Sequence, residues 1–70
     1  MSLSELRMTA NLSQQDVADS MNKKQPNLSK IERSSDMYVS TLCDFVRAIG
    51  GELEITVNLP EGKIRINQFD

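Results

Sequence analysis

The chain has 70 residues, of which 39% are hydrophobic and 26% charged, and its formal net charge at neutral pH is −2. This length allows one small domain, and the composition is too apolar for a disordered tail. The single cysteine excludes an internal disulfide, and the lack of histidine argues against a conventional metal or acid–base centre. No apolar run approaches the ~18 residues that a membrane span needs, so we expect a cytoplasmic protein. We also expect no cofactor.

Residues 2–10 are predicted to form the first helix. Ser2 and Glu5 have the spacing of a capping box, and apolar residues recur three and four positions apart at Leu3, Leu6 and Ala10. Asn11 follows as a suitable residue to end the helix.

A second short helix and a tight turn are predicted from residue 13 onward. Ser13 is a good N-cap, and Asp16 three residues later can complete a second capping box. Val17, Ala18 and Met21 then fall on one helical face. Asn22 stands where a turn is needed, and asparagine tolerates the left-handed conformation better than most residues.

A third helix is predicted to begin near Pro26, which sets φ for a first helical turn. Leu28 and Ile31 supply its apolar face. Two short helices joined by a tight turn have the layout of a helix-turn-helix.

The same segment resembles the phage repressor and Cro type of helix-turn-helix. That family's pattern opens with Leu, Ser or Thr, and Gln, has Ala in mid-helix and a glycine-like turn, and continues with Gln or Ser at the head of the recognition helix. It ends with Ser-x-Ile/Leu-Glu. The matching residues, in unbroken register, are Leu12-Ser13-Gln14, Ala18, Asn22, Gln25 and Ser29-Lys30-Ile31-Glu32. The departures are Asn22 at the glycine position and Pro26 at a base-reading position, and the second affects sequence preference rather than fold.

The resemblance implies that the N-terminal end of the second helix of the pair enters the major groove of DNA. The predicted base-reading residues are Gln25, Pro26, Asn27 and Lys30. Glutamine and asparagine amides can bond the N6/N7 edge of adenine, lysine can reach a guanine edge or a phosphate, and proline offers only van der Waals contact. The predicted phosphate contacts are Ser13, Gln14, Lys23, Lys24 and Arg33. Together with Lys30, the last three of these residues form a basic face on an acidic protein. For each residue the alternative is ordinary polar surface.

The resemblance also implies an ion pair between the first helix and the end of the recognition helix. The residues concerned here are Arg7 and Glu32, and we expect the pair to be largely desolvated. A free surface arginine is the alternative. The first helix is shorter than its counterpart in the family, which leaves two origins open: a chain that starts late, or a leader at Met1-Ser2-Leu3.

A fourth helix is predicted after the polar loop at residues 33–36, with Ser40 as its N-cap. Its apolar stripe is Leu42, Phe45, Val46 and Ile49, and Gly50-Gly51 ends it. Cys43 lies beside the stripe, and we interpret it as small core filler rather than a reactive thiol.

An antiparallel hairpin is predicted at the C-terminal end. Residues 52–59 and 63–67 alternate polar and apolar side chains, Pro60-Glu61-Gly62 forms the turn, and Glu52 or Glu54 can face Arg65. We expect one side of the hairpin to pack on the fourth helix of its own chain. The outer edge would pair with a second copy, because an open edge invites another strand. The predicted dimer interface is Leu53, Ile55, Val57, Ile64 and Ile66.

These elements predict a mainly α fold: a four-helix, truncated lambda-repressor-like helix-turn-helix domain with a C-terminal antiparallel β-hairpin. We divide it into residues 1–50, the DNA-binding domain, and residues 51–70, a hairpin that extends the same domain for dimerisation. The helix Ser-Thr-Leu-x-x-Phe-Val-x-Ala-Ile-Gly-Gly, followed by Leu-Glu-Ile and a Pro-x-Gly hairpin, resembles the HigA-like antitoxins of type II toxin–antitoxin pairs.

That second resemblance implies a homodimeric transcriptional repressor that binds a palindromic operator in double-stranded DNA. It also implies a partner toxin that cleaves mRNA, for which the hairpin edge is a second possible use. The alternatives are a stand-alone transcriptional regulator and a protein-interaction module that acts through the hairpin. We reject an enzyme, because the sequence has no nucleophile–base pair, no recognisable motif of paired carboxylates and no glycine-rich phosphate loop.

Overall fold

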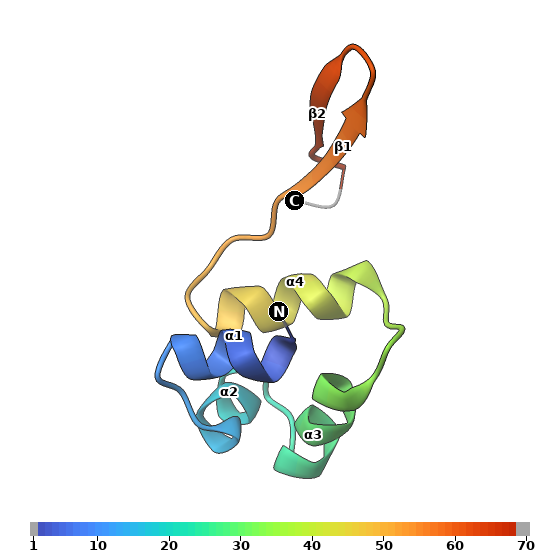
Figure 1. Cartoon of the computed structure of the whole chain (residues 1–70). Helices are drawn as coiled ribbons and strands as arrows, with labels where there is room; N and C mark the ends of the chain where they lie inside the picture. Colours follow the sequence, from blue (N-terminus) through green and yellow to red (C-terminus); the bar gives the residue numbers. More distant parts are fainter. Residues whose placement is uncertain (1, 69–70) are drawn as a thin grey trace.

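The computed structural model describes residues 2–68. Its elements are α1 (Leu3–Thr9), α2 (Gln14–Ser20), α3 (Gln25–Arg33), α4 (Val39–Ala48), β1 (Ile55–Leu59) and β2 (Gly62–Ile66). Figure 1 shows the helices gathered into one body and the hairpin projecting from it. The predicted fold class is confirmed. Met1, part of the leader considered above, and the last two residues of the hairpin segment lie outside the described residues.

The starts of the first two helices are fixed by the predicted capping boxes. The Ser2 and Ser13 hydroxyls each accept from the backbone N–H three residues on, and the Glu5 and Asp16 carboxylates return the bond. The predicted start of α4 is wrong: the helix begins at Val39, with Tyr38 as an N-cap that makes no side-chain bond. Val39 extends the apolar face by one more turn and is half-buried, so burial outweighs the better capping chemistry of Ser40.

Three of the described helices end in the same way, with a left-handed residue after the last turn. Asn11 has φ of 60°, Asn22 of 57° and Gly50 of 88°. In each case the next backbone N–H donates to the carbonyl five positions earlier, which is the Schellman arrangement. The pairs are Leu12 to Arg7 at 3.3 Å, Lys23 to Ala18 at 2.8 Å and Gly51 to Val46 at 2.9 Å. The sharp turns after α1 and α2 bring α1, α2 and α3 close together, and the turn after α4 leads the chain toward the hairpin.

The core lies where α2, α3 and α4 meet. Val17, Ala18, Leu28 and Phe45 are fully inaccessible to solvent, and the half-buried side chains packed around them are Leu3, Leu12, Met21, Ala48 and Ile49. Cys43 is buried at 8% exposure on the same helix as Phe45. Because these contacts join three helices, they fix the orientation of α3 relative to α2.

The hairpin has one apolar and one polar face. Its antiparallel register places Ile55 opposite Ile66, Val57 opposite Ile64 and Leu59 opposite Gly62, while Thr56–Arg65 and Asn58–Lys63 alternate with them on the other face. The first strand starts at Ile55, three residues later than predicted, because β2 ends at Ile66 and leaves residues 52–54 without a ladder partner. The second strand is displaced by one residue from the prediction, beginning at Gly62.

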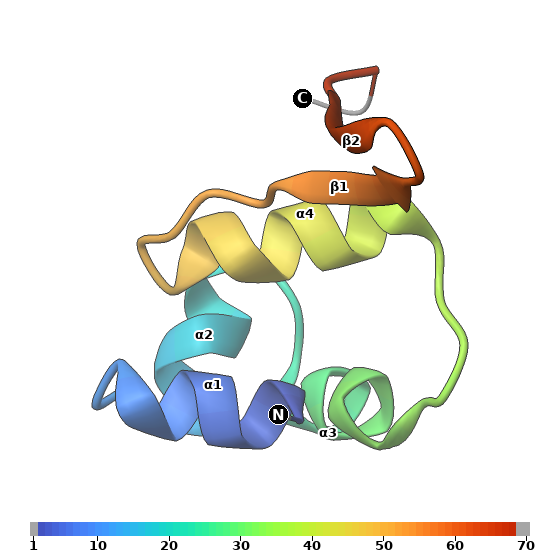
Figure 2. The ribbon, with the colours of Figure 1, turned by 45° about the horizontal axis from the view of Figure 1, so that its top comes forward.

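The expectation that one side of the hairpin packs on its own fourth helix is wrong. Figure 1 shows the strands projecting beyond the helical body, with a connecting segment between the end of α4 and β1. In Figure 2, where the top of the molecule is turned forward, β1 passes across α4 in the view. Val57, Leu59 and Ile64 remain 37%, 44% and 52% exposed, and only Ile55 and Ile66 at the base are half-buried. The described chain is correspondingly elongated, with principal extents of 43 × 22 × 20 Å. None of the helices in the described part of the chain could span a membrane.

Candidate nucleic-acid interface

The exposed N-terminal end of α3 carries the predicted base-reading side chains. Gln25 is the first residue of this helix, and Pro26 lies in its first turn. The structure brings Gln25, Pro26 and Asn27 together on the surface, with Lys30 one turn further on and also exposed. Leu28 points the other way, into the core, so these side chains are presented by a helix whose inner face is fixed. This surface can meet the edges of bases.

The predicted phosphate contacts divide into two groups. Lys23 and Lys24 are exposed and line a shallow hollow beside the α2–α3 turn together with Asp19, Asn22 and Asn27. Arg33 lies at the other end of α3, where its Nε donates to the carbonyl of Ser29 at 3.3 Å. The structure therefore places cations at both ends of the recognition helix but does not bring them into one cluster.

Ser13 is already engaged within its own helix. Its Oγ accepts from the Asp16 N–H at 3.0 Å, and its N–H donates to Asp16 Oδ2 at 3.0 Å. The bond from the Ser13 backbone, followed by that from its hydroxyl, lowers the pKa of Asp16 below the ordinary aspartate value. The Ser13 hydroxyl thus caps α2, and its contact with a phosphate stays a prediction.

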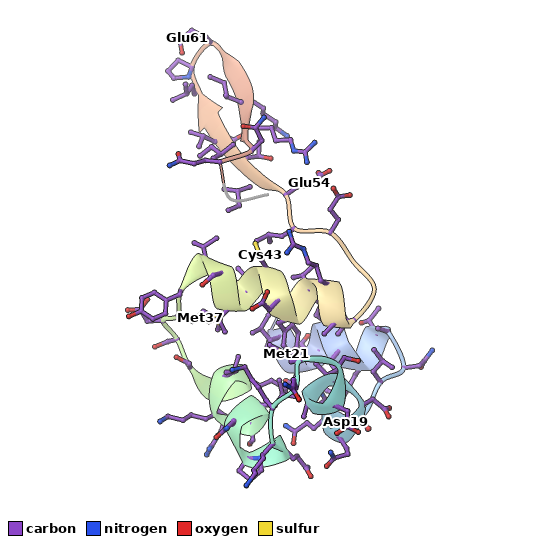
Figure 3. All side chains as sticks on the ribbon, turned by 180° about the vertical axis from the view of Figure 1, so that it is seen from behind. Asp19, Met21, Met37, Cys43, Glu54 and Glu61 are labelled. Atoms are coloured by element: carbon purple, nitrogen blue, oxygen red, sulfur yellow. The ribbon has the colours of Figure 1, made fainter. Side chains whose placement is uncertain are left out.

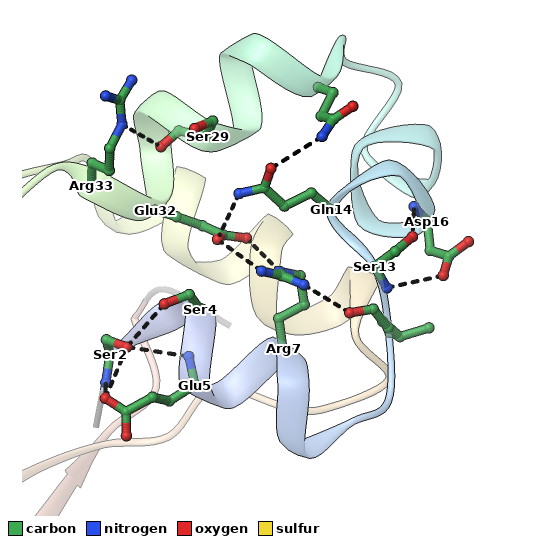
Figure 4. A network of polar contacts seen from close by, with 12 residues as sticks. Ser2, Ser4, Glu5, Arg7, Ser13, Gln14, Asp16, Ser29, Glu32 and Arg33 are labelled. Carbon is green, nitrogen blue, oxygen red and sulfur yellow. Dashed lines mark hydrogen bonds and ion pairs between the residues drawn. The ribbon is translucent and has the colours of Figure 1, made fainter.

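Arg7 and Glu32 form a nearly buried ion pair between α1 and α3 (Figure 4). Arg7 Nε lies 2.8 Å from Glu32 Oε2, and Arg7 Nη2 donates to Glu32 Oε1 at 3.3 Å. The third contact of the guanidinium, from Nη1 to the Leu12 carbonyl, is 2.9 Å long. The two side chains are only 12% and 3% exposed. A bidentate pair with an added bond to the α1–α2 loop ties the end of α3 to the scaffold.

Gln14 connects this ion pair to the recognition surface, a link that the sequence analysis did not predict. Its Nε2 donates to Glu32 Oε1 at 3.1 Å, and its Oε1 accepts from Gln25 Nε2 at 3.3 Å. The sequence signal is a glutamine at the first position of both helices of the pair. That signal becomes informative only once the crossing of α2 and α3 is known.

Tyr38 was assigned no function from the sequence. It is the only tyrosine of the chain, is 82% exposed as the N-cap of α4, and lines a shallow hollow with Lys30. An aromatic residue between a polar loop and a helix, off the apolar stripe, is the sequence signal that could have found it. Its hydroxyl can donate to a phosphate oxygen.

The apolar face of the hairpin is the second unusual surface. Val57, Leu59 and Ile64 lie on it and are exposed, whereas the polar side chains occupy the opposite face. The predicted interface residues Ile55, Val57, Ile64 and Ile66 share this face in the register of the two strands. The predicted interface also includes Leu53, which precedes β1 and is half-buried. A contiguous apolar surface of this kind is typical of a protein–protein contact.

The comparisons with known proteins agree on the kind of protein. Residues 2–58 match the family described as Helix-turn-helix domain. No curated protein matches the chain significantly.

Two solved structures resemble the whole chain. One is a HigA antitoxin described by "induced DNA bending by unique dimerization", which is 30% identical with a TM-score of 0.85 over 99% of this chain and 92% of that chain. The other is the DNA-bound antitoxin HigA3, also 30% identical, with a TM-score of 0.89 over 100% of this chain and 94% of that chain. The chain therefore belongs to the helix-turn-helix family and is a regulator of the HigA-like antitoxin type.

Proposed function

We propose that this protein is a sequence-specific, double-stranded DNA-binding repressor that acts as a homodimer. In this proposal it is the antitoxin of a type II toxin–antitoxin pair and represses its own operon from the cytoplasm. The observation that carries the proposal is the exposed, polar N-terminal end of α3, held by a buried face and by the Arg7–Glu32 pair. A solved relative of the same type is described as DNA-bound.

Base recognition would follow from the position of α3. With the start of this helix in the major groove, Gln25 and Asn27 can each offer an N–H and a carbonyl oxygen to an adenine edge. Pro26, which has no side-chain hydrogen-bonding group, adds only van der Waals contact, and Lys30 can reach a guanine or a phosphate. Such contacts discriminate only if the helix is held in one orientation, which the buried side of α3 supports.

The charge distribution favours this face despite the net charge of −2. Lys23, Lys24 and Arg33 flank α3, while the one acidic residue of the helix, Glu32, is paired with Arg7. Figure 3 shows Glu61 at the tip of the hairpin and Glu54 on the segment that leads into it, away from α3, whereas Asp19 lies on α2. DNA would therefore meet the basic end of the molecule, where the local potential matters more than the total charge.

A dimer would explain the hairpin. We propose that residues 51–70 extend the DNA-binding domain of residues 1–50 and join two copies through the apolar face. Two-stranded hairpins are marginal in water, and this one leaves Val57, Leu59 and Ile64 exposed. Two recognition helices could then reach half-sites about 34 Å apart on one side of the duplex. A solved relative is described by its unique dimerization.

The base-reading proposal is tested by the substitution Gln25→Ala. A preferred duplex is first selected from a random library, and binding is compared with that of a scrambled duplex at fixed salt. We expect a loss of about 1–3 kcal/mol on the preferred duplex and little change on the scrambled one. The matched control is Gln15→Ala, which removes the same amide from α2. Equal losses on both duplexes would mean that Gln25 contacts no base.

The phosphate contacts are tested through salt dependence. Replacing Lys23, Lys24 or Arg33 with Ala should lower the slope of log K against log salt by about one unit each. Lys63→Ala, on the polar face of the hairpin, is the control and should leave the slope as it is. A slope unchanged in all three variants would remove these cations from the interface.

The dimer is tested by sedimentation of matched hairpin variants. Ile64→Asn places an amide on the apolar face, and Lys63→Asn places the same group next to it on the polar face. We expect the first to sediment as a monomer and to lose operator affinity, and the second to behave as the parent chain. A monomeric parent at tens of micromolar would contradict the dimer, and a hairpin that binds the toxin would then be the better interpretation.

A gene for a small basic ribonuclease-like protein beside this one would support the toxin pairing.

A further inference from the structure

The polar contacts around Glu32 form a chain that ends at a base-reading residue (Figure 4). Arg7 contacts both carboxylate oxygens of Glu32, Gln14 Nε2 donates to Glu32 Oε1 at 3.1 Å, and Gln25 Nε2 donates to Gln14 Oε1 at 3.3 Å. The charged end of the chain is nearly buried, and the Gln25 end is exposed. A charge inside the scaffold is thus coupled through two amides to the surface that would face DNA.

The direction of each bond in this chain follows from chemistry. The carboxylate of a salt bridge accepts hydrogen bonds and donates none, so the end of the Gln14 amide that faces Glu32 has to be the NH2 group. The oxygen of Gln14 then faces outward, and an oxygen only accepts. Gln25 therefore has to turn its own NH2 group toward Gln14. One fixed charge leaves each glutamine with a single orientation.

Arg7 keeps that charge in place. Its guanidinium remains charged in proteins and donates to both oxygens of Glu32 at 2.8 and 3.3 Å. With side-chain exposures of 12% and 3%, neither partner is free to leave the other for water. The orientation of Gln14 is therefore set before DNA arrives.

We propose that Glu32, acting through Gln14, sets the amide orientation of Gln25 and is a positioning residue for sequence specificity. This inference rests on the proposed function, in which Gln25 contacts a base. After its bond to Gln14, Gln25 retains one N–H and its oxygen in a fixed spatial order, which matches the N7 acceptor and the N6 donor of adenine. A rotated amide would present the two groups in the opposite order and would not match the same edge in the same pose.

The test is Glu32→Gln, which keeps the shape of the side chain but lets its end both donate and accept. The matched control is Glu5→Gln. Glu5 Oε1 accepts from Ser2 Oγ at 3.1 Å, so the control changes a carboxylate that accepts a side-chain hydrogen bond on α1 and removes the same charge, but no base-reading residue follows it. Both variants lose one negative charge, and the general change in attraction to DNA cancels in a ratio of affinities for two duplexes.

The measured quantity is the ratio of affinities for two duplexes that differ only at the base pair assigned to Gln25. We expect Glu32→Gln to lower the preference for adenine at least about fivefold, the lower end of what a bidentate base contact discriminates. Glu5→Gln should leave the ratio unchanged. A merely structural function of Glu32 would weaken binding to both duplexes by the same factor and leave the ratio intact, which would overturn the inference.

Side-chain NH2 signals in the NMR spectrum of the free protein provide a second readout that needs no DNA. In Glu32→Gln the signals of Gln14 and Gln25 should both move, and in Glu5→Gln neither should. If the parent chain selects no sequence, the proposed function fails, but the NMR result still decides the orientation: unchanged Gln25 signals overturn it. Should Glu32→Gln be unfolded at the assay temperature, Gln14→Met removes the middle link without touching the ion pair, and a retained adenine preference in that variant overturns the inference.

Discussion

The helical body and the hairpin reach their structures by different means. In the body, Val17, Ala18, Leu28 and Phe45 are fully buried against one another. In the hairpin the apolar side chains are aligned on one face but stay in contact with water, Ile64 being 52% exposed. The body therefore has its own core, whereas the hairpin has backbone pairing and an apolar face that still needs a cover. Alternation in a strand therefore predicts an apolar face but not what covers it.

The same contrast appears in the ion pairs. Arg7 and Glu32 lie 2.8 Å apart with side chains 12% and 3% exposed, whereas Arg65 and Glu54 are 4.0 Å apart with side chains 49% and 63% exposed. The first pair joins two helices within the body, and the second lies at the base of the hairpin. Only the first is sufficiently shielded from water for its loss to matter.

Truncating one core residue should have the largest effect. Phe45→Ala should lower the free energy of unfolding by about 3–5 kcal/mol, because it leaves a cavity between three helices. Ile64→Ala should change the unfolding of the dilute, monomeric body by less than about 0.5 kcal/mol, because it removes contacts mainly with water. Urea unfolding followed by circular dichroism measures both. Comparable losses would show that the hairpin belongs to the same cooperative core.

The two ion pairs provide a second comparison. Glu32→Ala leaves the nearly buried Arg7 without a partner and should cost about 3–5 kcal/mol of stability. Glu54→Ala is the matched change in the exposed pair and should cost about 0–1 kcal/mol. Thermal unfolding of the two variants beside the parent chain provides the measurement. A Glu32→Ala variant as stable as the parent would mean that Arg7 finds water or another acceptor.

Left-handed residues occur in both regions and allow a comparison of smaller size. Asn22→Ala forces alanine into φ of 57° at the helix-turn-helix turn and should cost about 1–2 kcal/mol. Gly62→Ala meets no atom that would clash, but its φ of 138° is accessible almost only to glycine. We expect Asn22→Ala to lower the melting temperature of the body and Gly62→Ala to leave it unchanged while weakening association. A lower melting temperature in both variants would contradict the independence of the two regions.

The smallest expected effect concerns the cap of α2 and its pH dependence. Because the Ser13 backbone and hydroxyl lower the pKa of Asp16 in the folded state, Asp16 contributes stability above its unfolded pKa. That contribution is lost as the pH falls through the lower, folded pKa. Asp16→Asn should therefore reduce the acid sensitivity of unfolding. Urea midpoints measured across the acidic range test this, and identical pH profiles would show no linkage at Asp16.

Local rules predicted the helical body well. Both capping boxes, the left-handed Asn22 and the glycine that ends α4 depend on a few neighbouring residues, and all were predicted from their spacing. The start of α4 was predicted two residues too late, because capping chemistry favoured Ser40 while the burial of Val39, a tertiary effect, decided the outcome.

Apart from the Arg7–Glu32 pair, which the resemblance implied, features that depend on how elements meet were not predicted. The Gln14 bridge requires the relative position of α1, α2 and α3, which no spacing in one helix contains. We expected the apolar face of the hairpin to pack on α4, the nearest apolar surface of the same chain. The hairpin instead projects beyond the helical body. The exposed side chains at the start of α3 followed from the motif. The contacts of Gln14 with Glu32 and Gln25, which would orient those side chains, did not.

The separation of the hairpin from the body has a consequence for the order of assembly. The body is made of short helices whose contacts are close in sequence, so it should fold in milliseconds or faster and at a rate independent of protein concentration. The apolar face of the hairpin follows the body along the chain, and its burial against a second chain would be a bimolecular step. During synthesis a folded DNA-reading unit would therefore exist before the surface that pairs it. Refolding should accordingly show a fast phase that is insensitive to dilution and a slower one that scales with concentration.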